Sequence, residues 1–222
     1  MGVAENLQKI QNQIPPHVTL VAVSKTKPDE LIMEAYSSGH RDFGENKVQD
    51  LARKAERLPG DIRWHMIGHL QSNKVKYMAS FVHLVHGVDS FKLLNVINKE
   101  AAKHNRVIDC LMQVRIAREQ TKFGFSRDEL LEVVQSDSFG ELENVRIRGV
   151  MGMATYNENS GQIREEFRHL KRIFDELRTG VFSKNKSFDQ LSFGMSADYQ
   201  LAVDEGSTMV RIGSLIFGAR NY

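Results

Sequence analysis

The stretch LVAVSKTKP, residues 20–28, decides the fold, because it describes a buried strand that ends beside a lysine. Four apolar residues come first, and Pro28 closes the stretch. Side chains alternate between the two faces of a strand, so Lys25 shares a face with the core residues Val21 and Val23. The sequence therefore predicts an amine in line with core side chains, at the carboxyl end of a buried strand.

Seven further stretches repeat this strand pattern, and helical stretches alternate with them. The expected strands are 18–24, 42–46, 64–70, 81–90, 107–116, 145–155, 190–196 and 208–214, and the clearest amphipathic helices are 28–39, 89–105 and 162–180. Strict alternation favours a parallel sheet, and about eight strand–helix units close into a barrel. We therefore predict an α/β fold: one (β/α)8 TIM-barrel domain over residues 1–222, with an extra helix at 2–13.

An open doubly wound sheet is the alternative architecture. Neither a G-x-G-x-x-G nor a G-x-x-x-x-G-K-[ST] motif opens the first expected helix after a strand, which counts against it. The last expected strand is followed by only a few residues, so we expect no long final helix.

The composition is that of an ordinary soluble protein and excludes several classes. Of 222 residues, 41% are hydrophobic and 26% charged, with a net charge of +2, which is too small to argue for nucleic-acid binding. Arg53, Lys54 and Arg57 are expected to form a solvated helix face. No apolar run approaches the ~20 residues of a membrane span, and no signal peptide opens the chain. The single cysteine, Cys110, is expected to be a core residue, and a cytoplasmic location is expected.

Two stretches near the C-terminus contain residues typical of an anion site. Gly194 permits a tight turn before Ser196, which is expected to N-cap a helix ending near Gly206. Gly213 and Ser214 follow the last expected strand. Barrels frequently hold phosphate in the loops after strands seven and eight, where these residues fall. Plain turns and helix caps would use the same residues, but the coincidence of both stretches favours phosphate.

Lys25 and Arg211 complete a set of groups that one cofactor would use. Burial would lower the pKa of the lysine amine and free it for Schiff-base chemistry. Arg211 shares the inward face of Gly213 and needs a partner, which could be a ring nitrogen, a phosphate or a carboxylate. Pyridoxal 5′-phosphate (PLP) fits all these groups; a Schiff-base aldolase acting on a sugar phosphate fits nearly as well.

The chain resembles the YggS/PROSC family of pyridoxal phosphate homeostasis proteins over nearly its whole length. The matching stretches are LVAVSKTKP, FGENKVQD, WHMIGHLQSNK, RGVMGMAT, LSFGMSADYQLAVDEGSTMVRIG and IFGARNY. The resemblance implies a fold-type III barrel like the N-terminal barrel of alanine racemase.

The resemblance also implies roles for individual residues. Lys25 matches the lysine that forms the internal aldimine, and Arg211 matches the arginine facing the pyridine nitrogen. Ser196, Gly213 and Ser214 match the phosphate-binding positions. Cofactor-binding positions are also expected at Asn46, His65 and Met195, beside or near the ring. His65 and His69 are not expected to share a metal, because i and i+4 lie roughly 13 Å apart in a strand.

The family's role implies a protein that holds PLP for vitamin B6 and amino-acid homeostasis without robust catalysis. An arginine beside the pyridine nitrogen weakens the ring as an electron sink. The second base of the alanine racemases comes from another domain, which this chain is not expected to contain. The alternative is a weak PLP-dependent amino-acid racemase. Expected partners are PLP and apo-PLP enzymes, with no nucleic acid, membrane or metal, and a monomer is expected.

Overall fold

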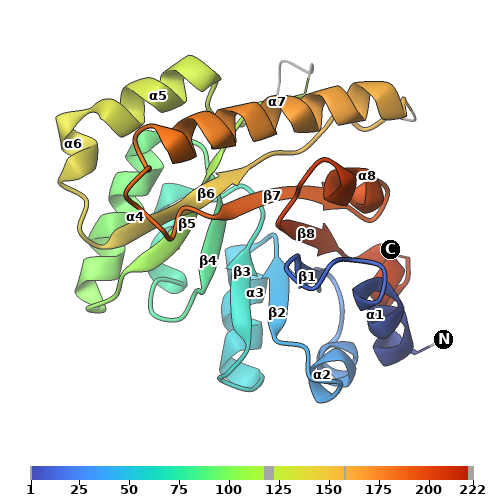
Figure 1. The fold of residues 1–222 in the computed structure, drawn as a ribbon. Coiled ribbons are helices and arrows are strands. Elements are labelled where there is room, and N and C mark those ends of the chain that lie inside the picture. The colour runs from blue at the N-terminus through green and yellow to red at the C-terminus, as the bar shows by residue number, and fades with distance from the viewer. Residues whose placement is uncertain (1, 118–122, 158, 220–222) are drawn as a thin grey trace.

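A closed parallel barrel of eight strands forms the centre of the molecule. The computed structural model describes residues 2–117, 123–157 and 159–219. The strands are β1 (Thr19–Val23), β2 (Asp42–Glu45), β3 (Arg63–Met66), β4 (Leu84–Val88), β5 (Ile108–Gln113), β6 (Val145–Met151), β7 (Gln190–Met195) and β8 (Met209–Ile212). Each pairs with the next in parallel, and β8 pairs back to β1, which closes the ring (Figure 1). The (β/α)8 prediction is confirmed, and all eight expected strands exist.

Helices cover the outside of the barrel (Figure 1). They are α1 (Val3–Gln11), α2 (Asp29–Ser37), α3 (Val48–Arg57), the 3-10 helix η1 (Ser72–Tyr77), α4 (Phe91–Lys103), α5 (Arg127–Gln135), α6 (Asp137–Gly140), α7 (Ser160–Thr179), α8 (Tyr199–Asp204) and α9 (Ser214–Phe217). In the described part of the chain, no helix has the length and apolar character needed to cross a membrane. The extra N-terminal helix is confirmed as α1, whereas the extent of one domain over 1–222 stays a prediction.

The core has two parts, as alternation along barrel strands requires. Outward-facing strand residues such as Phe43 and Val85 pack against the helices in one large apolar cluster. A second, smaller cluster is built from Val21, Leu84, Leu111, Met151 and Met209, one residue from each of five strands. This second cluster fills the barrel interior, so the barrel is a packed core and not a pore.

Several expected boundaries need correction. The strand expected at 64–70 ends at Met66, and residues 67–71 form the connection to η1. The helix after β7 begins at Tyr199 with Asp198 as its N-cap residue, so the expected cap at Ser196 is wrong. The N-cap residue of α4 is Ser90, whose hydroxyl accepts a hydrogen bond from the Leu93 amide at 3.3 Å.

Candidate functional site

The loops after β7, β8, β1 and β2 meet at the carboxyl end of the barrel. Because β8 pairs with β1 and Val23 lies beside Gly44 of β2, these loops are neighbours around the closed ring. Gly213 packs so close to β1 that a Cβ there would lie 3.1 Å from the carbonyl oxygen of Val23. The residues after these strands include Lys25 and Asn46, both half-buried, so one end of the barrel gathers them.

The turn that carries Lys25 has an unusual backbone. It lies two residues beyond the end of β1, and the Lys27 amide donates to the Ser24 carbonyl at 3.0 Å to close it. Thr26 has φ of +64°, in the left-handed region that β-branched residues rarely occupy. Such a conformation persists only where the surrounding structure imposes it, and it occurs most often at functional sites.

A buried ion pair supports this turn from below. The Lys54 ammonium, from α3, donates to the Ser24 carbonyl at 2.9 Å and to Oε1 of Glu45 at 2.6 Å. The Ser24 hydroxyl donates to the same Glu45 oxygen at 2.7 Å. Burial raises the pKa of the Glu45 carboxyl, and the Lys54 ammonium opposes that effect. These hydrogen bonds therefore connect Ser24, the residue before Lys25, to both β2 and α3.

The prediction that Arg53, Lys54 and Arg57 form a solvated helix face is wrong for Lys54. Arg53 and Arg57 are largely exposed, but the Lys54 side chain is only 3% exposed. A signal was present in the sequence, because Lys54 follows Val48 and Leu51 at helical spacing and lies on the same buried face.

The loops after β7 and β8 are joined directly to each other. The Ser196 hydroxyl accepts a hydrogen bond from the Gly213 amide at 3.2 Å. Gly194 has φ of +97°, and a Cβ there would lie 2.5 Å from the Ala202 Cβ, so this tight turn requires glycine. Ser214 follows as the first residue of α9 and is exposed. Ser196, Gly213 and Ser214, the residues predicted to bind phosphate, therefore lie close together.

Arg211 lies inside the barrel below these loops, as its position in β8 predicts. Its Nη1 donates to the backbone oxygen of Ser192 at 3.1 Å and to its hydroxyl at 2.6 Å, and Nη2 donates to the Gly152 oxygen at 3.2 Å. Burial lowers the pKa of this guanidinium to about 10, against the opposing effect of Asp198, so it is still charged at neutral pH.

These bonds leave part of the Arg211 guanidinium for another acceptor. Within the described residues they use both hydrogens of Nη1 and one of Nη2, out of five N–H groups. Met195, half-buried, is the register partner of Arg211 in β7. The site thus offers a buried donor, with the two hydrogen-bonded loops after β7 and β8 at the rim above it.

His65 lies apart from the other predicted residues. Its Nε2 bonds Oδ1 of Asp42, at the start of β2, at 3.0 Å, and its ring contacts that of His83, which precedes β4. Its Nδ1 bonds Nε2 of His86 at 2.9 Å. The structure therefore places His65 toward the amino end of the barrel and does not bring it beside Lys25.

The amino end contains a charged cavity of about 180 Å³, which includes His65 and His83 in its lining. Ligand atoms of Asp42, His65 and His83 lie within 4.8 Å of one another, a spacing that a metal ion could use. However, Nε of Arg63 donates to Oδ1 of Asp42 at 2.7 Å, and Nη2 of Arg63 pairs with the second oxygen. Arg63 therefore already neutralises the negative charge of Asp42 at this cavity.

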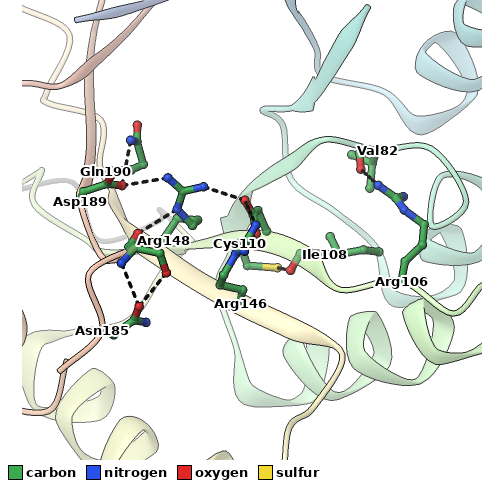
Figure 2. Close-up of polar contacts among 11 residues, drawn as sticks. Val82, Arg106, Ile108, Cys110, Arg146, Arg148, Asn185, Asp189 and Gln190 are labelled. Carbon is green, nitrogen blue, oxygen red and sulfur yellow. Dashed lines mark hydrogen bonds and ion pairs between the residues drawn. The ribbon is translucent and has the colours of Figure 1, made fainter. Parts of the chain in front are cut away.

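A second set of ion pairs lies at the same end of the barrel and joins β5, β6 and the residue before β7. Arg146 and Arg148 both bind Asp109, and Arg148 also reaches Asp189 at 3.0 Å (Figure 2). Cys110, beside them in β5, is fully buried, and burial raises the pKa of its thiol. The prediction of a core cysteine is confirmed.

Sequence reasoning missed His86, Ser192 and Lys54 as residues connected to the site. The signal for Ser192 was its place two residues before Gly194, on the same inward face of β7. The ring of His86 is fully buried and has hydrogen-bond partners at both nitrogens, His65 and Ser192.

The residues at the carboxyl end fit a phosphorylated aldehyde with a ring nitrogen. They offer a lysine, a backbone and hydroxyl cradle for an anion, and a buried guanidinium with N–H groups to spare. PLP has the three matching groups: an aldehyde, a phosphate and a pyridine nitrogen.

Comparisons with known proteins identify relatives over almost the whole chain. The family model of the alanine racemase N-terminal domain matches residues 2–221. The pyridoxal phosphate homeostasis protein of Aquifex aeolicus is 42% identical over 204 residues, covering 91% of this chain and 87% of the relative.

Two solved structures are similar to this chain over almost its whole length. PipY of Synechococcus elongatus, determined without PLP, has a TM-score of 0.91 at 34% identity, covering 97% of this chain and all of that one. The PLP-bound PipY structure has a TM-score of 0.86 at 33% identity, with the same coverage.

Proposed function

The chain belongs to the pyridoxal phosphate homeostasis proteins, within the family of the alanine racemase N-terminal domain, and we propose that it binds PLP at the carboxyl end of its barrel. The observation that carries this proposal is the guanidinium of Arg211, buried below the joined loops of Ser196 and Gly213 with N–H groups left for an acceptor. The relative with PLP bound, PipY, supports the choice of cofactor.

Each predicted residue except His65 has a distinct task in this proposal. Lys25 would hold PLP covalently, because its amine can condense with the aldehyde group with loss of water. Ser196, Gly213 and Ser214 bind the phosphate through amide and hydroxyl groups. Arg211 would donate to the ring nitrogen, and Asn46 and Met195 would contact the ring.

We further propose that the protein holds PLP for homeostasis without robust catalysis. A guanidinium is a donor only, so a ring nitrogen that it faces must stay an acceptor. An unprotonated pyridine withdraws electrons weakly, which slows bond breaking at an amino-acid α-carbon. A monomeric carrier that supplies apo-PLP enzymes is the role that this argument favours.

Weak amino-acid racemization is the second candidate. The shared fold with alanine racemases, at 16% identity and a TM-score of 0.75 for the Bartonella henselae enzyme, supports the architecture and not the activity. Incubation of the PLP-loaded protein with L-alanine, followed by circular dichroism, separates the two functions. Turnover that disappears in Lys25→Ala would replace the carrier role with catalysis.

The binding proposal is tested by titrating the purified protein with PLP and recording the visible spectrum. We expect a visible band that borohydride bleaches, with the reduced adduct on the peptide that contains Lys25. Lys25→Ala should lose the band and the adduct, while Lys103→Ala, an exposed lysine on α4, should keep both. An adduct on another lysine in the wild-type protein would contradict the assignment.

A further inference from the structure

A continuous chain of buried hydrogen bonds crosses the barrel from Arg211 to the amino-end cavity. The Arg211 guanidinium donates to the Ser192 hydroxyl at 2.6 Å, and that hydroxyl lies 3.4 Å from Nδ1 of His86. Nε2 of His86 then meets Nδ1 of His65 at 2.9 Å, and Nε2 of His65 meets Asp42 at 3.0 Å. All five side chains belong to buried residues, and they come from five different strands.

The two ends of this chain fix the direction of every bond in it. A guanidinium only donates, and an ionised carboxylate only accepts. A neutral imidazole has one donor and one acceptor nitrogen. The Ser192 hydroxyl therefore donates to His86, which donates to His65, which donates to Asp42. Both histidines must carry their proton on Nε2.

The surroundings of His86, in the middle of the chain, favour its neutral form. Burial lowers the pKa of His86 well below its ordinary value, and the positive charge of Arg211 acts in the same direction. Toward the amino end the charged and titratable groups are Arg63, Asp109, Arg148 and His83, and toward the carboxyl end the carboxylate is Asp198.

We propose that His86 is a positioning residue for Arg211, and that it acts through Ser192. With its Nδ1 committed as an acceptor, the hydrogen of the Ser192 hydroxyl points at His86 and the oxygen lone pairs point at Arg211. Both Nη1 hydrogens of Arg211 are then held by Ser192, so the remaining N–H groups stay directed away from β7. This inference rests on the proposed function, in which those groups meet the PLP ring nitrogen.

The chain of bonds also gives a role to His65 that differs from direct contact with the cofactor. His65 orients His86 from the amino end, because its Nδ1 accepts the hydrogen bond from Nε2 of His86, and Asp42 in turn holds Nε2 of His65. A change at the amino-end cavity is thereby connected to the cofactor nitrogen through three side chains.

Two substitutions of His86 with opposite properties test the proposal by PLP titration. His86→Asn keeps an oxygen near the position of Nδ1 that can accept from Ser192, whereas His86→Leu fills the space without an acceptor. We expect His86→Leu to weaken PLP binding roughly tenfold, as for the loss of one hydrogen bond to a charged group, and to shift the visible band. His86→Asn should stay near the wild-type affinity. If His86 only filled space, His86→Leu would bind PLP more tightly than His86→Asn.

Ser192→Ala provides a second variant that removes the hydroxyl with little change in volume. It should weaken PLP binding by a similar factor, and the double variant Ser192→Ala/His86→Leu should be no weaker than Ser192→Ala alone. Additive losses would mean that His86 acts on the cofactor by another route and would overturn the proposal.

Nitrogen-15 NMR of the histidine rings tests the bond directions without cofactor. We expect His86 and His65 as neutral imidazoles with the proton on Nε2. A proton on Nδ1 of His86 would break the chain and contradict the proposal. If wild-type protein forms no adduct on Lys25, the proposed function fails; if it does and His86→Leu binds PLP with unchanged affinity and spectrum, only the positioning role fails.

Discussion

Asp42, at the start of β2, is an ionised group whose environment links stability to pH. Burial acts to raise the pKa of its carboxyl, but hydrogen bonds from Arg63 and His65 outweigh that effect and hold the pKa well below its usual range. A carboxyl with a depressed folded-state pKa stabilises the protein above its unfolded value, about 4, and that stabilisation is lost as pH falls through the folded value.

We therefore expect Asp42→Asn to lower the free energy of unfolding at pH 7 by on the order of 2 kcal/mol. The difference from wild type should shrink as pH falls below 4, because the Asp42 carboxyl of the unfolded wild-type chain becomes protonated there while the folded one stays ionised, which favours unfolding of the wild type. Urea unfolding at pH 7, 5, 4 and 3 measures this, with Asp128→Asn, whose side chain is 89% exposed, as the control. A difference that grows on acidification would contradict the linkage.

Residue-scale reasoning from sequence succeeded where one strand face decided the outcome. Alternation along β8 put Arg211 inside the barrel, and the structure agrees. It failed where a helix side chain pairs with a strand side chain: Lys54 of α3 is buried against Glu45 of β2, although a charged residue in a basic stretch suggested exposure. His65 faces inward as a barrel-wall residue, but its partners Asp42 and His86 come from other strands, so only the fold shows which end it serves.

At the scale of elements, β6 carries an irregularity that glycine makes possible. Its pairing with β5 shifts register between Ile147 and Gly149, and Gly149 has φ of +154°. A Cβ on Gly149 would lie 1.7 Å from the carbonyl oxygen of Gln190 in β7, closer than atoms can approach. The pairing of β6 with β7 thus depends on this glycine.

Gly149→Ala should destabilise the protein by more than about 4 kcal/mol, among the largest effects of a single methyl group. Thermal unfolding followed by circular dichroism, together with soluble yield, measures the effect. Gly140→Ala, in α6, is the matched control, because a Cβ there has no atom within 4 Å. Equal stability of the two variants would mean that β6 and β7 can separate without loss.

The elements themselves were largely predictable, and their boundaries were not. Runs of β-branched and large apolar residues identified all eight strands, because barrel strands are buried on both faces. The end of β3 at Met66 was missed, since the apolar residues of 67–70 continue the pattern after the strand has turned into a loop. The start of α8 was missed because Asp198, not Ser196, occupies the cap position.

At the scale of the whole molecule, the two ends of the barrel differ in chemistry. The carboxyl end gathers glycine turns and hydroxyls around Lys25, whereas the amino end is a ring of arginine–aspartate pairs. The arginine and aspartate charges at the amino end are paired with each other, so the proposed anion site is confined to the carboxyl end. The N-terminal helix α1 packs against α9, the helix that begins at Ser214 (Figure 1). The first helix of the chain therefore contacts an element of the carboxyl end.

The contact of α1 with α9 predicts that a core change far from Lys25 affects the phosphate loop. The side-chain amide of Asn6 donates to the Ile216 carbonyl of α9 at 3.1 Å, and Leu7, one residue on, is 1% exposed. Leu7→Ala should lower the free energy of unfolding by about 2 to 5 kcal/mol, from lost burial and the cavity that is left. It should also weaken PLP binding, because α9 loses its support, and added PLP should raise the melting temperature of the variant.

Differential scanning calorimetry with and without PLP separates these effects. Gln8→Ala, at an exposed position of α1, is the control and should leave both the melting temperature and the PLP affinity near wild type. If Leu7→Ala loses stability but binds PLP with wild-type affinity, then α1 stabilises the barrel without shaping the loop at Ser214, and the coupling between the first helix and the cofactor end is wrong.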